Sequence, residues 1–227
     1  MIEVDLARTS VRALNERLHR LPADTNERLW RVLNPRGAHA IAAGLTVPVE
    51  VEIEGHVGYY CAGMNQEASV TVHGHAGTGV AENIMNGVVR VTGNASQSTA
   101  ASGRGGLVVI EGDASARCGI SMKGVDIVVG GAIGHMSCFM GQAGALVVCG
   151  DAGADLGDSL YEADIFVAGK VASLGADCIE KEMTDADVAR VAALLRRAGI
   201  AADASRFRHY GSARQLYHFH VDHAAAY

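Results

Sequence analysis

A glycine recurs every nineteen residues through the middle of this chain of 227 residues. Aliphatic residues stand two and four positions before it in every repeat, and small or aliphatic residues stand two and three positions after it. Seven repeats follow one another without an insertion. A fixed period of this length is typical of solenoids and other repeat folds. We call the seven repeated residues the anchor glycines: Gly55, Gly74, Gly93, Gly112, Gly131, Gly150 and Gly169.

Each repeat carries one short strand signal. In the stretch VRVTGNAS, residues 89–96, apolar and polar side chains alternate and a glycine follows, which indicates a half-buried strand and then a corner. The two aliphatic positions before each glycine lie on one strand face and point inward. The sequence therefore predicts an all-β protein, a right-handed parallel β-helix of about seven nineteen-residue coils over residues 49–177. Leucine-rich repeats would need leucine columns, and left-handed hexapeptide helices would need a six-residue sub-period.

The anchor glycines are the predicted structural corners of the coils. Glycine at a fixed place in every coil indicates either a positive φ or a close approach of two backbones. We expect Gly93 and Gly112 to show one of these two features, and we expect neighbouring coils to approach closely there.

Both ends of a solenoid need caps, because the end coils expose strand edges and apolar core. Residues 1–48 are predicted to form an N-terminal cap with a helix, because Val11, Leu14, Leu18 and Leu21 share one helical stripe that ends at Pro22. Residues 178–227 are predicted to form a C-terminal helix and a docking tail. Thr184 is the expected N-cap of this helix and Gly199 lies beyond its end. Its expected apolar stripe comprises Val188, Val191, Ala192 and Leu195.

Composition narrows the class of function. Hydrophobic residues make up 49% of the chain, so a large core is available. The formal net charge of −6 and the absence of a basic block argue against nucleic acid as a partner. The sequence contains no run of 18 apolar residues, and its start shows no signal-peptide pattern. We therefore expect a cytoplasmic protein without a membrane span. The five cysteines form no C-x-x-C pair, and reduced core thiols without a metal are expected.

No motif in the sequence predicts an active site. The glycine-rich stretches lack the spacing of dinucleotide-binding and phosphate-binding loops. Glu111 and Asp113 are the only paired carboxylates between residues 88 and 150, and they flank a predicted corner, where a solvated turn is expected. His218, His220 and His223 do not align on one element as metal ligands would. We therefore expect no catalytic, cofactor-binding or metal-binding residue in this chain.

The repeat resembles a known family. GDAGADLG at Gly150, Gly153 and Gly157 has the spacing G-x-x-G-x-x-x-G, and GHVGYYCAG at Gly55 and Gly58 begins in the same way. These motifs resemble the C-terminal β-helix domain of the glutamate synthase large subunit and the related β-helix polypeptide of formylmethanofuran dehydrogenase. Further stretches, among them NPRGAHAIAAGL, GTGVAENIMNG, GHMSCFMGQAG and GSARQLYHFHVDHAAAY, look closer to the stand-alone β-helix subunit of N-methylglutamate synthase and similar three-subunit systems.

The resemblance implies a division of labour among subunits. One partner resembles a glutamine amidotransferase, another carries FMN and an iron–sulfur cluster in a glutamate synthase-like barrel, and the β-helix subunit holds the two in register. This chain fits the third role and is expected to be a structural subunit of a hetero-oligomer. The whole complex is expected to transfer ammonia or methylamine and to make glutamate or N-methylglutamate. Tyr217, Phe219 and Tyr227 are its candidate docking residues, because aromatic side chains favour interfaces. The alternative role for these rings is to cap the solenoid.

Two alternatives remain open at the level of sequence. One is a self-contained β-helix enzyme that acts on carbohydrate or acyl substrates. The other is a protein similar to the β-helix polypeptide of formylmethanofuran dehydrogenase.

Overall fold

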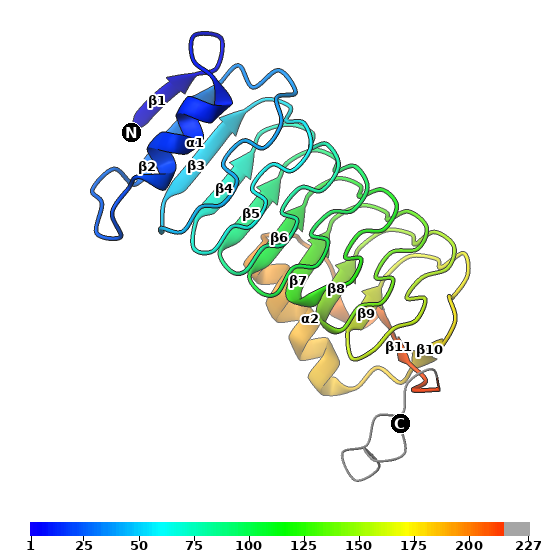
Figure 1. Cartoon of the computed structure of the whole chain (residues 1–227). Coiled ribbons are helices and arrows are strands. Elements are labelled where there is room, and N and C mark those ends of the chain that lie inside the picture. Colours follow the sequence, from blue (N-terminus) through cyan, green and yellow to red (C-terminus); the bar gives the residue numbers. More distant parts are fainter. Residues whose placement is uncertain (216–227) are drawn as a thin grey trace, which may run out of the picture.

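The computed structural model describes residues 1–215 as one elongated solenoid with a single eleven-stranded sheet (Figure 1). The sheet order is β1-β2-β3-β4-β5-β6-β7-β8-β9-β11-β10. The strands are β1 (Ile2–Asp5), β2 (Leu29–Leu33), β3 (Glu50–Glu54), β4 (Ser69–Val72), β5 (Val88–Val91), β6 (Leu107–Ile110), β7 (Lys123–Val129), β8 (Ala143–Val148), β9 (Asp164–Val167), β10 (Cys178–Lys181) and β11 (Arg208–Ser212). The helices are α1 (Val11–His19) and α2 (Asp185–Ala198), and a 3₁₀ turn spans Ala204–Arg206.

The register of the sheet follows the sequence period. From β3 to β9 every strand pairs in parallel with the strand one repeat further on, as Val51 pairs with Val70 and Val70 with Val89. One irregularity, a register shift between Lys123 and Asp126, interrupts this pattern in β7. The prediction of a parallel β-helix is confirmed.

The interior is filled by the repeated aliphatic positions. The residues two and four places before each anchor glycine are fully buried in every coil, as Val89 and Val91 illustrate. The position two residues after each glycine forms single parallel bridges from coil to coil, beginning with Val57 to Ala76 and Ala76 to Ala95. The strand and the bridge position therefore give each coil two walls that are hydrogen-bonded to the coils above and below.

The first coil lies before the regular period. Strand β2 pairs in parallel with β3, and Trp30 stands opposite Val51, so the offset is 21 residues instead of nineteen. The sheet therefore continues into the segment assigned to the N-terminal cap. Helix α1 begins at its N-cap Ser10 and buries Leu14 and Leu18. Asn15 holds this helix to the first coil, because its side chain donates to the carbonyl of Ala40 and accepts from the amide of Ala42.

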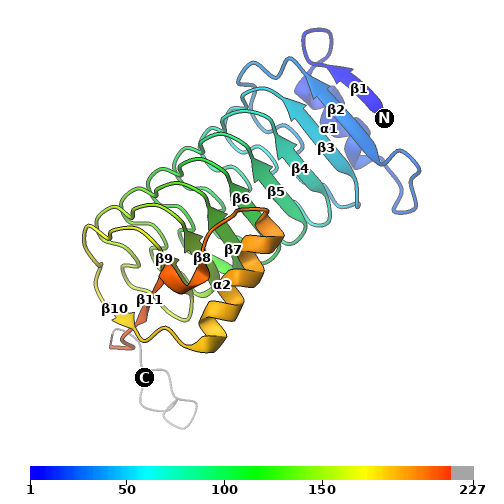
Figure 2. The ribbon, with the colours of Figure 1, turned by 180° about the vertical axis from the view of Figure 1, so that it is seen from behind.

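Helix α2 covers part of the outer face of the sheet. It begins at the N-cap Thr184 and ends at Gly199, which has a left-handed conformation, so both predicted boundaries are confirmed. Figure 2 shows the helix lying over the outer side of β6 to β9. The fully buried side of the helix also includes Leu194 and Ala198, which the expected stripe left out. Strand β11 then runs antiparallel to β9 and carries β10 on its other edge.

The anchor glycines stack directly on one another. The amide of Gly93 donates to the carbonyl of Gly74, and the same bond recurs in each later coil up to Gly169. Of the seven anchors only Gly55 has a positive φ, of 131°. Positive φ is found instead at glycines that precede the strands, such as Gly87 and Gly106. The close approach of backbones is therefore the feature that the anchor column displays.

A third wall of each coil has an unusual backbone. We call it the turn wall; it runs from the fourth to the eleventh residue after each of the first six anchor glycines and comprises residues 59–66, 78–85, 97–104, 116–123, 135–142 and 154–161. In each of these ranges the second, fourth and sixth residues have φ between 52° and 70°, and most of them are not glycine. Their amides donate to adjacent coils, as Tyr60 does to Thr78 and Ala62 to Ile41.

Candidate functional surface

A row of polar side chains follows the anchor glycines and ties successive coils together. His56 accepts a hydrogen bond from the amide of His75 at 2.9 Å, and His75 accepts one from the amide of Asn94 at 2.8 Å. Asp113 and Asp151 accept in the same way from the residues one coil further on. These exposed side chains satisfy backbone donors that would otherwise need water.

The carboxylates that the sequence set apart both have structural partners. Asp113 belongs to the polar row just described. Glu111 accepts a hydrogen bond from Arg90 at 2.8 Å, and Arg90 also donates to the carbonyl of Ala198 at 2.7 Å. Arg90 thus places a cation at the carboxyl end of α2, where the helix dipole favours positive charge. These contacts hold α2 against the sheet.

The sheet face beneath α2 is apolar, and this face was missed at the level of sequence. The residue three places before the anchor glycine is polar in the first three repeats, where it is Glu52, Thr71 and Arg90. From the fourth repeat on it is apolar and fully buried, at Val109, Val128, Val147 and Phe166. Strands that are apolar on both faces are typical of sheets covered on both sides. The change along this column marks the place where the helix docks.

The most buried charged cluster lies where α2, β9 and β11 meet. His209 is 8% exposed, stacks on Phe166 with ring centroids 4.8 Å apart, and shares a 2.8 Å hydrogen bond between its Nε2 and Oδ1 of Asp164. Arg190 donates to Oδ2 of Asp164 at 2.6 Å. Burial raises the pKa of Asp164, but the hydrogen bonds and charges of His209 and Arg190 outweigh burial and leave this pKa below its ordinary value. Each of these groups is used to join elements of the fold.

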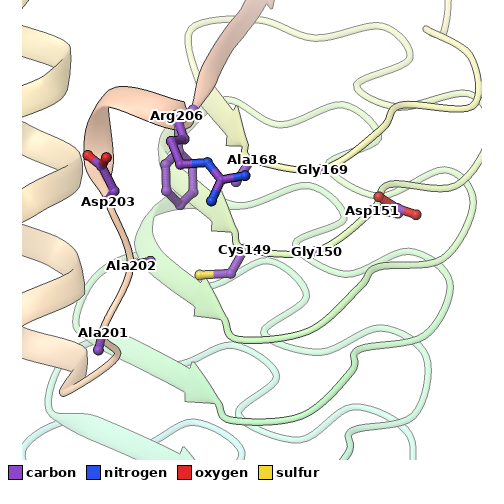
Figure 3. A pocket seen from close by; sticks show the side chains of 10 residues that line it. Cys149, Gly150, Asp151, Ala168, Gly169, Ala201, Ala202, Asp203 and Arg206 are labelled. Atoms are coloured by element: carbon purple, nitrogen blue, oxygen red, sulfur yellow. The ribbon is translucent and has the colours of Figure 1, made fainter.

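A cavity of about 430 Å³ lies between the ends of β8 and β9 and the segment that follows α2. Figure 3 shows Arg206 extending its guanidinium toward Ala168 and Cys149, with Asp203 on the same segment. Burial raises the pKa of the Cys149 thiol, so the thiol is protonated near neutral pH and is a poor nucleophile. The cavity is lined by the guanidinium of Arg206, the carboxylates of Asp151 and Asp203, the ring of Phe207 and several small residues.

The remaining thiols are buried in the solenoid. All five cysteines are free, and burial raises the pKa of Cys61 and Cys118 to about 12. Within residues 1–215, no group of three or more His, Cys, Asp or Glu side chains is arranged to hold a metal ion. None of the helices in the same range has the length and hydropathy that crossing a bilayer requires.

The turn wall exposes apolar side chains. Met64, Gln66, Asn83, Met85 and Arg104 line an open groove of about 390 Å³ on this wall. The predicted docking residues Tyr217, Phe219 and Tyr227 lie outside the described residues, as do the three histidines near the C-terminus. The groove was not predicted, because its lining residues belong to columns with no fixed chemistry along the sequence.

These features define a β-solenoid protein whose sheet wall is partly covered by its own helix and whose turn wall is left open by residues 1–215. Over 225 residues the chain is 58% identical to Protein GlxC of Rhizobium meliloti (strain 1021), and the match covers 99% of each protein. The chain therefore belongs to the GlxC family. No model of a protein family matches the chain.

Proposed function

We propose that this chain is a non-catalytic structural subunit of an N-methylglutamate synthase or a similar glutamate synthase-like complex. In this role it holds a glutamine amidotransferase-like subunit and a subunit with FMN and an iron–sulfur cluster at a fixed separation. Ammonia released by one partner, or methylamine taken up by the complex, then reaches the other partner and enters glutamate or N-methylglutamate. The chain acts within the cytoplasm and binds neither flavin nor cluster itself.

The observation that carries this proposal is the nearly unbroken register from β3 to β9. Six steps of about 4.8 Å make a body about 29 Å long in which the spacing of surface groups is fixed. The anchor glycines bond to one another from coil to coil, and so do the residues of the polar row beside them. Both sets of hydrogen bonds repeat the same spacing outside the strands. A rigid repeat body positions partners more readily than it transforms substrates.

The chemistry of the described residues supports the same role. Arg90, Asp164 and His209 are each engaged in holding α2 and the sheet together. The buried thiols have pKa values that keep them protonated, so they are not activated nucleophiles.

The test is reconstitution from three separately purified subunits. The isolated chain is expected to be colourless and to lack glutaminase and synthase activity. The two partners alone are expected to hydrolyse glutamine without turnover of the synthase subunit, and the addition of this chain is expected to couple the two reactions. Flavin bound to the isolated chain, or full synthase activity of the partners without it, would overturn the proposal.

A further inference from the structure

The exposed large apolar side chains of the described residues gather in two kinds of place. Met1, Leu29 and Ile179 lie in or beside strands near the two ends of the sheet. The other four all lie on the turn wall, and they are Tyr59 at 54% exposed, Met64 at 49%, Met85 at 44% and Met140 at 36%. Side chains of this size are enriched where a surface is covered by a partner. The turn wall is thus the apolar side of the solenoid that residues 1–215 leave open.

The groove on this wall is built from three successive coils. Met64 and Asn83 stand nine residues after their anchor glycines, and Gln66, Met85 and Arg104 stand eleven residues after theirs. The two methionines supply an apolar surface that can adapt to the shape of an inserted side chain. Gln66 and Asn83 supply hydrogen-bonding groups beside it. This combination fits a protein segment with one apolar anchor.

A positive charge borders the groove. Arg104 lines it, and Lys123 occupies the same column one coil further on, about 4.8 Å along the axis. Both side chains are exposed, and neither forms an ion pair with any residue in the range 1–215. Arg104 and Lys123 therefore form a local positive patch on a chain of net charge −6. They are complementary to a carboxylate on whatever enters the groove.

Building on the function proposed above, we propose that this groove is the docking site for a segment of one partner subunit. The segment inserts an apolar side chain between Met64 and Met85 and places a carboxylate against Arg104 and Lys123. The occupant is thus an acidic, apolar protein segment. The turn wall near the first three coils then faces that partner, and the wall under α2 faces away from it.

The experiment measures binding of each purified partner subunit to immobilised chain by biolayer interferometry. The variants are Met64→Glu/Met85→Glu, which places charge in the groove, and Arg104→Glu/Lys123→Glu, which reverses its border. Met140→Glu is the matched control, because Met140 is an exposed methionine of the same wall with a φ of 52°, close to the 55° of Met64. Thermal unfolding and light scattering of every variant report the fold and the oligomeric state.

Both double variants are expected to weaken one partner at least about tenfold, the loss typical of an anchor residue. Met140→Glu is expected to bind within about twofold of the wild type, because it lies outside the groove. The Arg104→Glu/Lys123→Glu variant is also expected to reverse the salt dependence of binding, because added salt then screens a repulsion instead of an attraction.

Three results would count against the inference, and they are distinguishable. Unchanged binding of both double variants would overturn the groove assignment and leave the proposed function standing. Failure of the wild-type chain to bind either subunit would overturn both. A wild-type dimer that Met64→Glu/Met85→Glu converts to a monomer, with subunit binding unchanged, would show that a second copy of the chain occupies the groove.

Discussion

At the scale of single residues, the anchor column requires glycine because the coil below occupies the space of a side chain. A Cβ added to Gly150 would lie 2.6 Å from the carbonyl carbon of Gly131 and 2.7 Å from its oxygen. Both atoms belong to the backbone, which cannot swing aside without breaking the hydrogen bond that Gly131 accepts from Gly150.

We therefore expect Gly150→Ala to lower the free energy of unfolding by about 1–3 kcal/mol, the usual range for overpacking. Chemical denaturation measures this change. Gly63→Ala is the control, because the nearest atoms to its added Cβ are in the partly exposed ring of Tyr60, which can rotate away. Equal losses at the two positions would contradict the steric explanation.

The turn wall imposes a different constraint on its residues. Ser98 has a φ of 61°, and the equivalent residue one coil earlier is Gly79, with a φ of 70°. A left-handed conformation costs a non-glycine residue about 1–2 kcal/mol, and the extra freedom of glycine in the unfolded chain offsets part of the relief.

Ser98→Gly is expected to raise the free energy of unfolding by up to about 1 kcal/mol, because it removes this strain. Ser98→Val is expected to lower it by at least about 1 kcal/mol, because β-branched residues tolerate positive φ poorly. Thermal and urea unfolding of the two variants provide the comparison. A stabilising effect of valine would rule out backbone strain as the explanation.

The anchor column and the left-handed positions of the turn wall differ in how readily the sequence reveals them. The anchor column is visible because close backbone approach admits no other residue at Gly74 or Gly150. The left-handed column is hidden, because inter-coil hydrogen bonds hold residues such as Ala62 and Met64 at positive φ without glycine. Tertiary bonding overrides local preference there, so no residue type identifies the turn wall in advance.

At the scale of elements, the contact of α2 with the sheet depends on the ionised side chain of Asp164. Its pKa lies below its ordinary value in the folded protein, despite the opposing effect of burial, because His209 and Arg190 bind its charged form. A group with a lowered folded pKa stabilises the fold above its unfolded pKa of about 3.9. That contribution is lost as the pH falls through the folded pKa.

Asp164→Asn is accordingly expected to cost about 1–3 kcal/mol of unfolding free energy at pH 6. The difference from the wild type is expected to shrink below about pH 4, where the wild type loses the same contribution. Urea unfolding between pH 2 and pH 6 measures both. Asp24→Asn, at an exposed position in the first 30 residues, is the control. A difference that stays constant across this range would show that charge is not involved.

Helix α2 illustrates how far sequence reaches at this scale. Its boundaries were predictable because Thr184 and Gly199 are local capping signals. Its docking position depends on the residue three places before the anchor glycine, which becomes apolar only at Val109, in the fourth repeat. The positions of His209 and Asp164, 45 residues apart, depend on how β11 returns to the sheet, which no local pattern specifies.

At the scale of the whole molecule, the period predicts that coils are interchangeable units. Deleting residues 74–92 removes one coil of nineteen residues and keeps every column in place. The shortened chain is expected to fold, with a lower unfolding midpoint, because one set of coil interfaces and the bond from Arg90 to Ala198 are lost.

Deleting residues 74–91 instead shifts every later column by one position, which sends inward side chains outward. This variant is expected not to fold. Circular dichroism and thermal unfolding of the two deletions compare them directly. Comparable unfolding midpoints for both would show that the register is not set by the columns.

The fold was predictable at this scale, and the candidate surface was not. Seven repeats of the same inward pair determine a parallel solenoid whatever the outer residues are. Surface chemistry depends on which outer residues of separate repeats become neighbours. Met64, Met85 and Arg104 lie about twenty residues apart in sequence and meet only because each coil sits on the last.

The constant register has a consequence for the outside of the molecule: its surface is a grid. One coordinate is the coil number, and the other is the position within the repeat. Exchanging the residues at two equivalent positions of adjacent coils moves a side chain by about 4.8 Å along the axis and leaves its direction unchanged. A contact such as that of Arg104 could therefore be relocated in fixed increments, so the distance between two bound partners would change by whole coils.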